Sequence, residues 1–297
     1  YKTLYVNSTG SNNMAFGYNS MYSNTLGSGN TALGPFSLYR NTEGNNNVAM
    51  GTYALNDNTT GCDNVGFGKQ ALQANTTGCY STAVGNGTLK ANTTGINNVA
   101  LGYESLKANT EGNCNTAIGF NSLLTNTTGI ENTAVGNSSL SANTYGDQNT
   151  AIGNEALLVN TTGGCNTAIG DSALKNNSTG SQNVALGSEA LVGNDDGNNN
   201  VAIGYSSLLS NTTGINNTTL GTCALLSNTI GTRNIGIGYQ AGNNITTGSG
   251  NVIIGQVDAV AVDSLRTLKI AGNDGTTTTT WISGDSAGLL NITGGEV

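Results

Sequence analysis

The residues that could carry chemistry in this chain of 297 residues are five cysteines, seventeen acidic side chains and repeated asparagines and threonines, because histidine is absent. Without histidine, neither Ser–His–Asp nor Cys–His catalysis can be built. Asp195 and Asp196 are the only adjacent acidic pair in residues 1–255, and neighbouring side chains on a strand point to opposite faces. Paired carboxylates for glycoside cleavage are therefore not expected. We predict that the chain is not an enzyme and has no catalytic residue, cofactor or metal.

The charge and hydropathy of the chain argue against two further classes of function. Nine basic and seventeen acidic residues give a net charge of −8, and no basic cluster offsets it, so we expect no nucleic-acid binding. No apolar run approaches the ~18–20 residues of a membrane span, so we expect no membrane insertion. Charged residues make up only 9% of the chain, whereas glycine occurs 44 times. This composition indicates a repetitive architecture rather than an ordinary globular domain.

The elements that position these residues are set by a repeat of seventeen residues that covers residues 1–255. When each repeat is numbered from one to seventeen, starting at residue 1, glycine occupies positions ten and seventeen in all fifteen repeats. An unbroken period of this kind is typical of a solenoid, in which each repeat is one turn. We interpret both columns as bends that need positive φ or close approach of neighbouring turns. The predicted turn glycines include Gly10, Gly17, Gly27, Gly34, Gly44, Gly51, Gly61, Gly68, Gly153, Gly170, Gly187 and Gly204.

The local sequence favours strands over helices. Asparagine, threonine and glycine are poor helix formers, and runs such as NTAIG (166–170) alternate and end at glycine, as a strand followed by a turn does. We predict an all-β fold: a parallel β-solenoid, or β-roll, of fifteen 17-residue coils over residues 1–255. Each coil would have two strands, at positions two to seven and twelve to sixteen. Residues 256–297 are predicted to form a short β-rich C-terminal module, with a hairpin around Asn273-Asp274-Gly275.

Alternation along the strand predicts which side chains share a face. Positions fourteen and sixteen lie on one face, and position fifteen, which is mostly alanine, lies on the other. We expect the first face and the leucine at position four to form the core, which includes Leu55, Leu72, Leu89, Leu106, Leu123, Leu140, Ile118, Ile152, Ile169 and Ile203. A face of small residues suits close approach to another chain. The predicted oligomer face is therefore Ala100, Ala117, Ala134, Ala151, Ala168 and Ala185.

Asparagine forms two further columns. Position thirteen is asparagine in every repeat except the one with Ser81, and position seven is asparagine in every repeat except the last, which has Ile245. Asparagines stacked ~4.8 Å apart can donate to and accept from the next turn. We predict such a ladder at Asn47, Asn64, Asn98, Asn115, Asn132, Asn149, Asn166, Asn183 and Asn200. Solvated turn residues are the alternative interpretation.

Other regular features have weaker functional interpretations. Threonine fills position eight in twelve of fifteen repeats, which raises ice binding as a minor alternative, although Ser178 and Asp195 interrupt the column. Acidic residues are scattered over several positions, so no calcium column is expected. Sequons such as Asn58-Thr59-Thr60 are interpreted as tight bends. Tyrosines at position one could contact saccharides, but ordinary surface variation is the default interpretation.

The five cysteines do not form a disulfide framework. Cys62 and Cys79 occupy the same position in adjacent repeats, so they are expected to lie within disulfide reach, which requires Cα atoms about 4.4–6.8 Å apart. Cys114 and Cys165 are three repeats apart, too far to bridge. Together with Cys223 the number is odd, and we expect folding that does not depend on disulfides.

The repeat resembles two related groups of fibrous proteins. It reads NTAIG-x-x-A-L-x-x-N-x-T-G, as in residues 166–180, and resembles the head repeats of trimeric autotransporter adhesins, which read roughly N-S-x-A-I-G-x-x-A-x-A-x-G. It is also similar to repeats of phage tail-fibre proteins, and the resemblance covers residues 1–255. Residues 265–288 are similar to tail-fibre segments that precede a cleavable trimerisation chaperone. The chain departs from the adhesin pattern in its longer turn and in leucine at position four.

The resemblance implies a left-handed β-roll assembled as a homotrimeric fibre. The implied function is the structural shaft of a viral tail fibre that supports host attachment, located in the virion. Its implied partners are further copies of itself, an upstream fibre or baseplate component, and a host surface receptor that is a glycan or a protein. The alternative is a bacterial cell-surface adhesin or extracellular filament subunit, which would bind through exposed repeat positions one, two, eleven and twelve.

Overall fold

The computed structural model describes residues 2–293 and confirms an all-β parallel solenoid of about fifteen turns with a 17-residue spacing. No helix occurs in that range. Each turn contributes one strand at positions fourteen to sixteen. The strands are β1 (Met14–Phe16), β2 (Thr31–Leu33), β3 (Val48–Met50), β4 (Val65–Phe67), β5 (Thr82–Val84), β6 (Val99–Leu101), β7 (Thr116–Ile118), β8 (Thr133–Val135), β9 (Thr150–Ile152), β10 (Thr167–Ile169), β11 (Val184–Leu186), β12 (Val201–Ile203), β13 (Thr218–Leu220), β14 (Ile235–Ile237) and β15 (Val252–Ile254).

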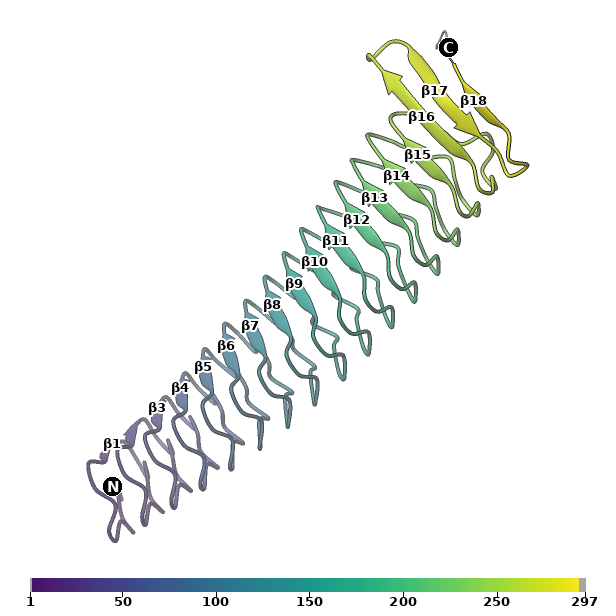
Figure 1. Cartoon of the computed structure of the whole chain (residues 1–297). Coiled ribbons are helices and arrows are strands. Elements are labelled where there is room, and N and C mark those ends of the chain that lie inside the picture. Colours follow the sequence, from purple (N-terminus) through teal and green to yellow (C-terminus); the bar gives the residue numbers. More distant parts are fainter. Residues whose placement is uncertain (1, 294–297) are drawn as a thin grey trace. The chain divides into compact units, whose positions relative to one another are not determined.

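The chain divides into two compact units between Asn149 and Thr150. In the first unit, the successive strands from β1 to β8 pair with one another in parallel and in register, so that Ala100 lies opposite Ala117 (Figure 1). In the second unit, β9 to β15 pair in the same way, and Ala168 lies opposite Ala185. Equivalent residues of successive repeats therefore stack within each unit, as a period without insertions requires.

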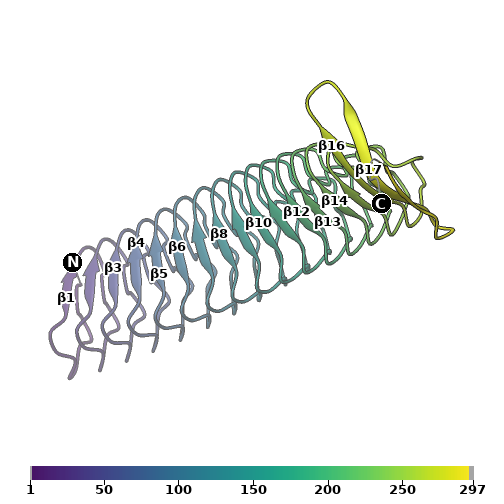
Figure 2. The same ribbon diagram turned by 45° about the horizontal axis from the view of Figure 1, so that its top comes forward.

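The C-terminal segment adds three strands to the second unit. Strand β16 (Leu268–Asn273) pairs in parallel with β15 and antiparallel with β17 (Thr278–Gly284), which pairs antiparallel with β18 (Leu290–Ile292). The β16–β17 hairpin is visible in Figure 2 and turns at Asn273-Asp274-Gly275, as the sequence predicts. Residues 294–297 of the predicted module lie outside the described residues.

The prediction of a second strand at positions two to seven is wrong. Positions two and four have positive φ in successive turns, for example 60° at Tyr53 and 49° at Leu55, whereas a strand needs negative φ. The segment therefore follows a series of turns (Figure 2). Its backbone still bonds to the next repeat, because the Leu55 N–H donates to the Ala71 carbonyl at 3.0 Å.

The interior of each turn is filled by the leucine of position four and the alanine of position fifteen. Leu55 and its equivalents Leu72, Leu89, Leu106, Leu123 and Leu140 are fully buried, as predicted for the core. The alanines predicted to face another chain are also fully buried: Ala100, Ala117, Ala134, Ala151, Ala168 and Ala185. The predicted direction of the strand faces is therefore wrong, and position fifteen points inward.

The buried leucine of position four limits the size of the side chain at position fifteen. Gly66 stands at position fifteen, and a Cβ atom there would lie 3.4 Å from Leu55 Cδ1. A methyl group at position fifteen therefore reaches van der Waals contact with the leucine, and Thr219 is the largest side chain that is buried there beneath a leucine. The four isoleucines that were predicted to be in the core lie on the outer face instead: Ile118 and Ile152 are 36% and 39% exposed, and Ile169 and Ile203 are half-buried.

Candidate functional site

The surface that the fold leaves open for function is the outer face of the strands. We define the outward strand face as the side chains of positions fourteen and sixteen. Position sixteen is apolar in every repeat, and neither position carries a charged residue in any repeat. Leu101 is 46% exposed and Leu220 is 50% exposed. The well-exposed apolar members are Met14, Phe16, Leu33, Phe67, Val99, Leu101 and Ile118 in the first unit and Ile152, Leu186, Leu220, Ile235 and Ile237 in the second.

The outward strand face forms a continuous stripe along the strands of each unit. In the first unit eight strands spaced ~4.8 Å apart form a stripe about 34 Å long. With two side chains across its width, the stripe covers on the order of 300 Å², the lower end of the range for the largest patches on monomeric proteins, and position fourteen is threonine in four of its eight repeats. Depletion of charge at the centre of a patch is typical of protein interfaces. The outward strand face can therefore bury apolar surface against another chain.

The glycines at position seventeen allow the bend that follows each strand. Gly119 has φ +136°, and a Cβ atom there would lie 2.2 Å from the Gly136 carbonyl oxygen, so both the backbone conformation and the contact require glycine. The predicted turn glycines of this column all have positive φ: Gly17, Gly34, Gly51, Gly68, Gly153, Gly170, Gly187 and Gly204.

The glycines at position ten are needed for space alone. At the glycines of this column from Gly10 to Gly129 and from Gly163 to Gly231, whose φ is not in the left-handed region, an added Cβ atom would lie within 3 Å of the next repeat and of the local asparagine side chain. At Gly61, for example, the Cβ would be 2.4 Å from Asn58 Oδ1 and 2.5 Å from the Gly78 oxygen. The predicted members Gly10, Gly27 and Gly44 have the same surroundings.

The asparagines of position thirteen form a buried ladder. Asn183 Nδ2 donates to Asn166 Oδ1 at 3.2 Å and to the Gly197 carbonyl at 2.8 Å, and the Asn183 N–H also donates to Asn166 Oδ1. Each of the following donates in the same way to the carbonyl of the glycine fourteen residues later: Asn47, Asn64, Asn98, Asn115, Asn132, Asn166 and Asn200. Asn149 donates to Asn132 Oδ1. Where Ser81 replaces asparagine, its hydroxyl accepts from the Asn98 N–H at 3.3 Å.

A second ladder runs through position seven. Asn58 Nδ2 donates to Asn41 Oδ1 at 2.7 Å and to the Gly61 carbonyl at 2.9 Å, and Asn75 continues the pattern. The asparagines of the sequons Asn58, Asn75 and Asn211 are fully buried, so the folded chain leaves no room for a glycan on these side chains. Both ladders satisfy the backbone carbonyls of the bends at position ten, which would otherwise be buried without a partner.

The threonine column and the aromatic residues are used in contacts between repeats. Thr59 Oγ1 donates to the Thr76 carbonyl at 3.0 Å, and Thr76 donates likewise to Thr93. These hydroxyls bond to the chain itself and do not form a free array for ice. Tyr103 stacks on Phe120 with ring centroids 5.4 Å apart and an interplanar angle of 10°. Each ring therefore covers one face of the other, and these covered faces cannot stack on a saccharide.

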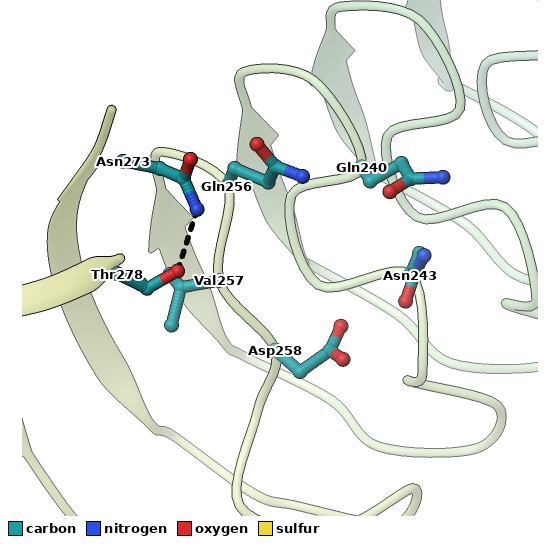
Figure 3. A pocket seen from close by; sticks show the side chains of 7 residues that line it. All are labelled: Gln240, Asn243, Gln256, Val257, Asp258, Asn273 and Thr278. Carbon is teal, nitrogen blue, oxygen red and sulfur yellow. Dashed lines mark hydrogen bonds between the residues drawn. The ribbon is translucent and has the colours of Figure 1, made fainter. Parts of the chain in front are cut away.

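The polar hollow near the C-terminal strands has no catalytic arrangement. Figure 3 shows it lined by the amides Gln240, Asn243, Gln256 and Asn273 together with Val257, Asp258 and Thr278. Asn273 Nδ2 donates to Thr278 Oγ1 at 2.6 Å. Asp258 is the single carboxylate in this hollow, whereas glycoside cleavage uses two. Within residues 2–293 no group of three acidic, cysteine or histidine side chains is arranged to hold a metal ion.

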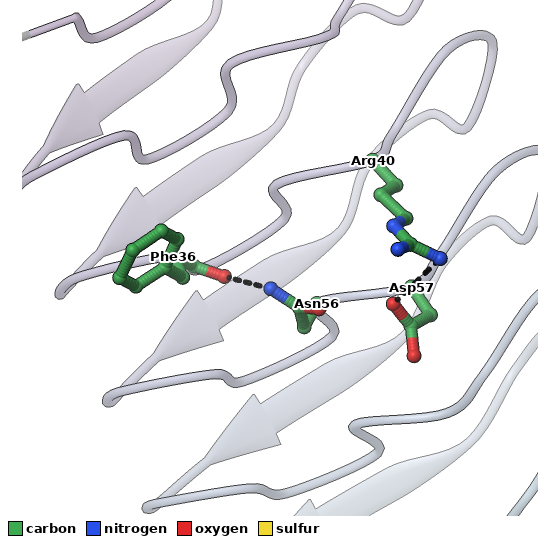
Figure 4. A network of polar contacts seen from close by, with 4 residues as sticks. All are labelled: Phe36, Arg40, Asn56 and Asp57. Atoms are coloured by element: carbon green, nitrogen blue, oxygen red, sulfur yellow. Dashed lines mark hydrogen bonds and ion pairs between the residues drawn. The ribbon is translucent and has the colours of Figure 1, made fainter.

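Polar contacts on the surface join consecutive repeats. Figure 4 shows Arg40 paired with Asp57 at 3.4 Å and Asn56 Nδ2 donating to the Phe36 carbonyl at 2.9 Å. The Arg40 side chain is 64% exposed, so this ion pair is worth at most about 1 kcal/mol. Such pairs support the stacking of repeats but form no ligand site.

Comparison with known proteins gives no family: no protein-family model matches the chain, and no match is found among curated proteins or solved structures. In the described part of the chain, no helix has the length and apolar character that crossing a bilayer requires.

Proposed function

We propose that the chain is the structural shaft of a viral tail fibre, a left-handed solenoid that assembles as a homotrimer and supports host attachment. The observation that carries this proposal is the uncharged outward strand face, whose position sixteen is apolar in every repeat without interruption. The resemblance of the repeat to fibre and adhesin repeats supplies the trimeric state, the hand of the coil and the location in the virion.

Stiffness is the property that a shaft needs, and the hydrogen bonding supports it. Strand ladders, the bent segment at positions two to seven and both asparagine ladders all bond each repeat to its neighbours within a unit. Bending would lengthen many of these bonds at once. The interior, in contrast, holds mainly leucine, alanine and small polar side chains, so burial of the outward strand face in a trimer would supply the apolar contact that each chain lacks.

The first test is the mass of the protein in solution. We expect a trimer of three times the 30.0 kDa chain, measured by analytical ultracentrifugation. The double variant Leu101→Glu/Ile118→Glu places charge on the outward strand face and is expected to dissociate the trimer while its circular dichroism is retained. Thr94→Glu, at an exposed site away from that face, is the matched control and should remain trimeric. A monodisperse wild-type monomer with full β-structure would refute the proposal.

A shaft and an adhesin differ in where binding occurs. A shaft places the receptor-binding site, for a glycan or a protein, in another part of the fibre, which an upstream fibre or baseplate component joins to the particle. An adhesin binds through its own exposed positions one, two, eleven and twelve. We expect no saturable binding of the protein to bacterial cells or glycan arrays. Saturable binding that is lost on substitution of Tyr205 and Tyr239, which stand at position one and are both more than half exposed, would favour the adhesin.

A further inference from the structure

We propose that Cys62 and Cys79 are a redox-active dithiol that closes into a disulfide joining two consecutive turns. The two Sγ atoms lie 2.8 Å apart, and both residues are half-buried, so small reagents can reach them. A displacement of less than an ångström would bring the sulfurs to the ~2.05 Å of a disulfide bond. This modification site is independent of the proposed shaft function.

The position of Cys79 Sγ is fixed by a slot that recurs along the solenoid. At position eleven, the backbone N–H of one repeat donates to the side chain of the next: Ser11 to Ser28 at 3.1 Å, and Ile96 to Asn113 at 2.8 Å. In the cysteine pair, the Cys62 N–H donates to Cys79 Sγ at 3.0 Å. The slot therefore holds one sulfur directly above the backbone of the residue that carries the other.

The two thiols differ in their readiness to react. Cys62 Sγ donates its hydrogen toward Cys79 Sγ, and this bond, with burial and the nearby Asp63, raises the pKa of Cys62 to about 12. Two donors, the Cys62 N–H and the Cys62 thiol, point at Cys79 Sγ, so the Cys62 thiol holds its proton in this contact. Cys79 is thus the nucleophile, and Cys62 is the resolving thiol.

The oxidant is a small-molecule disulfide such as oxidised glutathione. The Cys79 thiolate attacks one sulfur of the reagent, whose S–S bond breaks and releases one thiolate, which takes up a proton. Cys62 then loses its proton to solvent and attacks Cys79 Sγ in the mixed disulfide, which releases the second thiolate. The two cysteines lose two electrons and two protons in total, and the reagent is reduced to two thiols.

Peptide mapping of the full chain tests the proposal directly. Trypsin cleaves after Arg40, Lys69 and Lys90, so Cys62 and Cys79 fall in separate peptides, 41–69 and 70–90, each with one cysteine. After incubation of the folded protein with oxidised glutathione, alkylation and digestion, we expect these two peptides to be linked. The intact chain should lose the mass of two hydrogen atoms and remain monomeric on a denaturing non-reducing gel.

Variants separate the two roles. Ser11 and Ser28 show that position eleven accepts serine, so Cys62→Ser should fold, and it should trap glutathione on Cys79 as a mixed disulfide. Cys114→Ser is the matched control and should leave the linked peptide unchanged. In the wild-type chain, brief alkylation should modify Cys79 about tenfold faster than Cys62, or more.

Three results would overturn the proposed disulfide, and a fourth would overturn the assignment of its nucleophile. Separate glutathione adducts on Cys62 and Cys79 without a linked peptide would show that the pair does not close. Linkage only after unfolding would show that the folded slot does not bring the sulfurs together. A covalent dimer on the non-reducing gel would place the bond between chains. Equal alkylation of the two cysteines would refute the assignment of Cys79 as the nucleophile.

Discussion

Removal of one amide from the position-seven ladder should destabilise the chain by an amount that the contacts define. Asn126 Nδ2 donates to Asn109 Oδ1 at 2.8 Å and to the Gly129 carbonyl at 3.0 Å, and its Oδ1 accepts from Asn143 at 2.9 Å. In Asn126→Ala, Asn109 Oδ1 loses its donor in a buried site, which costs ~1–3 kcal/mol. Asn143 loses one acceptor, which costs about 1 kcal/mol more. The Gly129 carbonyl keeps Asn115 as a donor.

We therefore expect Asn126→Ala to lower the free energy of unfolding by about 2–4 kcal/mol, measured by urea denaturation and circular dichroism. The exposed Asn86→Ala is the control and should change stability by less than about 0.5 kcal/mol.

A double-mutant cycle sharpens this test. Once Asn126 is absent, removal of Asn109 also removes the stranded oxygen, so the double variant should cost ~1–3 kcal/mol less than the sum of the single variants. Additive costs, or a loss below about 1 kcal/mol for Asn126→Ala, would refute the view that the ladder is a chain of mutually dependent buried bonds.

Four further predictions follow from particular backbone and side-chain positions. Gly119→Ala combines φ +136° with a 2.2 Å contact and should cost at least about 3 kcal/mol in thermal or urea unfolding, whereas Gly87→Ala, with φ +69° and its nearest neighbour at 3.4 Å, should cost about 1 kcal/mol. Tyr80 is 60% exposed and has φ +59°, so Tyr80→Asn should raise stability by about 0.5–1 kcal/mol; a loss would contradict the strain argument. Ala117→Gln should lower the free energy of unfolding by ~2–4 kcal/mol, whereas Ile118→Gln should leave that of the dissociated chain unchanged within about 0.5 kcal/mol. The opposite order, measured by urea denaturation, would show that Ile118 and not Ala117 faces the interior. The Asp274 carboxylate accepts from the Thr276 and Thr277 N–H groups, which lower its pKa to about 2, so its contribution to the hairpin should be complete above about pH 4 and lost as the pH falls through about 2; carboxyl titration by NMR near pH 4 would contradict this.

The sequence was sufficient to predict the period, the strand at the end of each repeat and the hairpin at Asp274. Each of these depends on local chemistry that recurs or is distinctive, such as the glycine at every seventeenth residue. The second strand was not predictable as a turn, because leucine rarely adopts positive φ and nothing in its neighbours marks Leu55 for that conformation.

The direction of the strand faces was missed for a different reason. Alternation separates Ala117 from Ile118 but does not say which one faces the interior, and a small residue suits both a thin interior and a close neighbour. Variation in size was the signal that could have decided: position sixteen ranges from Val84 to Phe67, whereas position four is almost always leucine. Stacked identical interiors favour one volume, and an outer face tolerates several.

The side-chain amides of the position-seven ladder are oriented in one direction. Asn24 donates back to Asn7, Asn143 to Asn126, and Asn194 to Asn177, so the amide dipoles add within each unit instead of cancelling. This column of hydrogen bonds therefore has an N–H terminus and an oxygen terminus. If two copies were joined end to end, the hydrogen bonds of the column would continue only where the N–H terminus of one copy met the oxygen terminus of the other. In the last repeat, however, Ile245 occupies the position from which the next asparagine would donate. Asn228 Oδ1 accepts instead from Asn234 Nδ2 at 3.4 Å. Ile245 therefore ends this column of side-chain hydrogen bonds, so the column offers no template there for the addition of further copies.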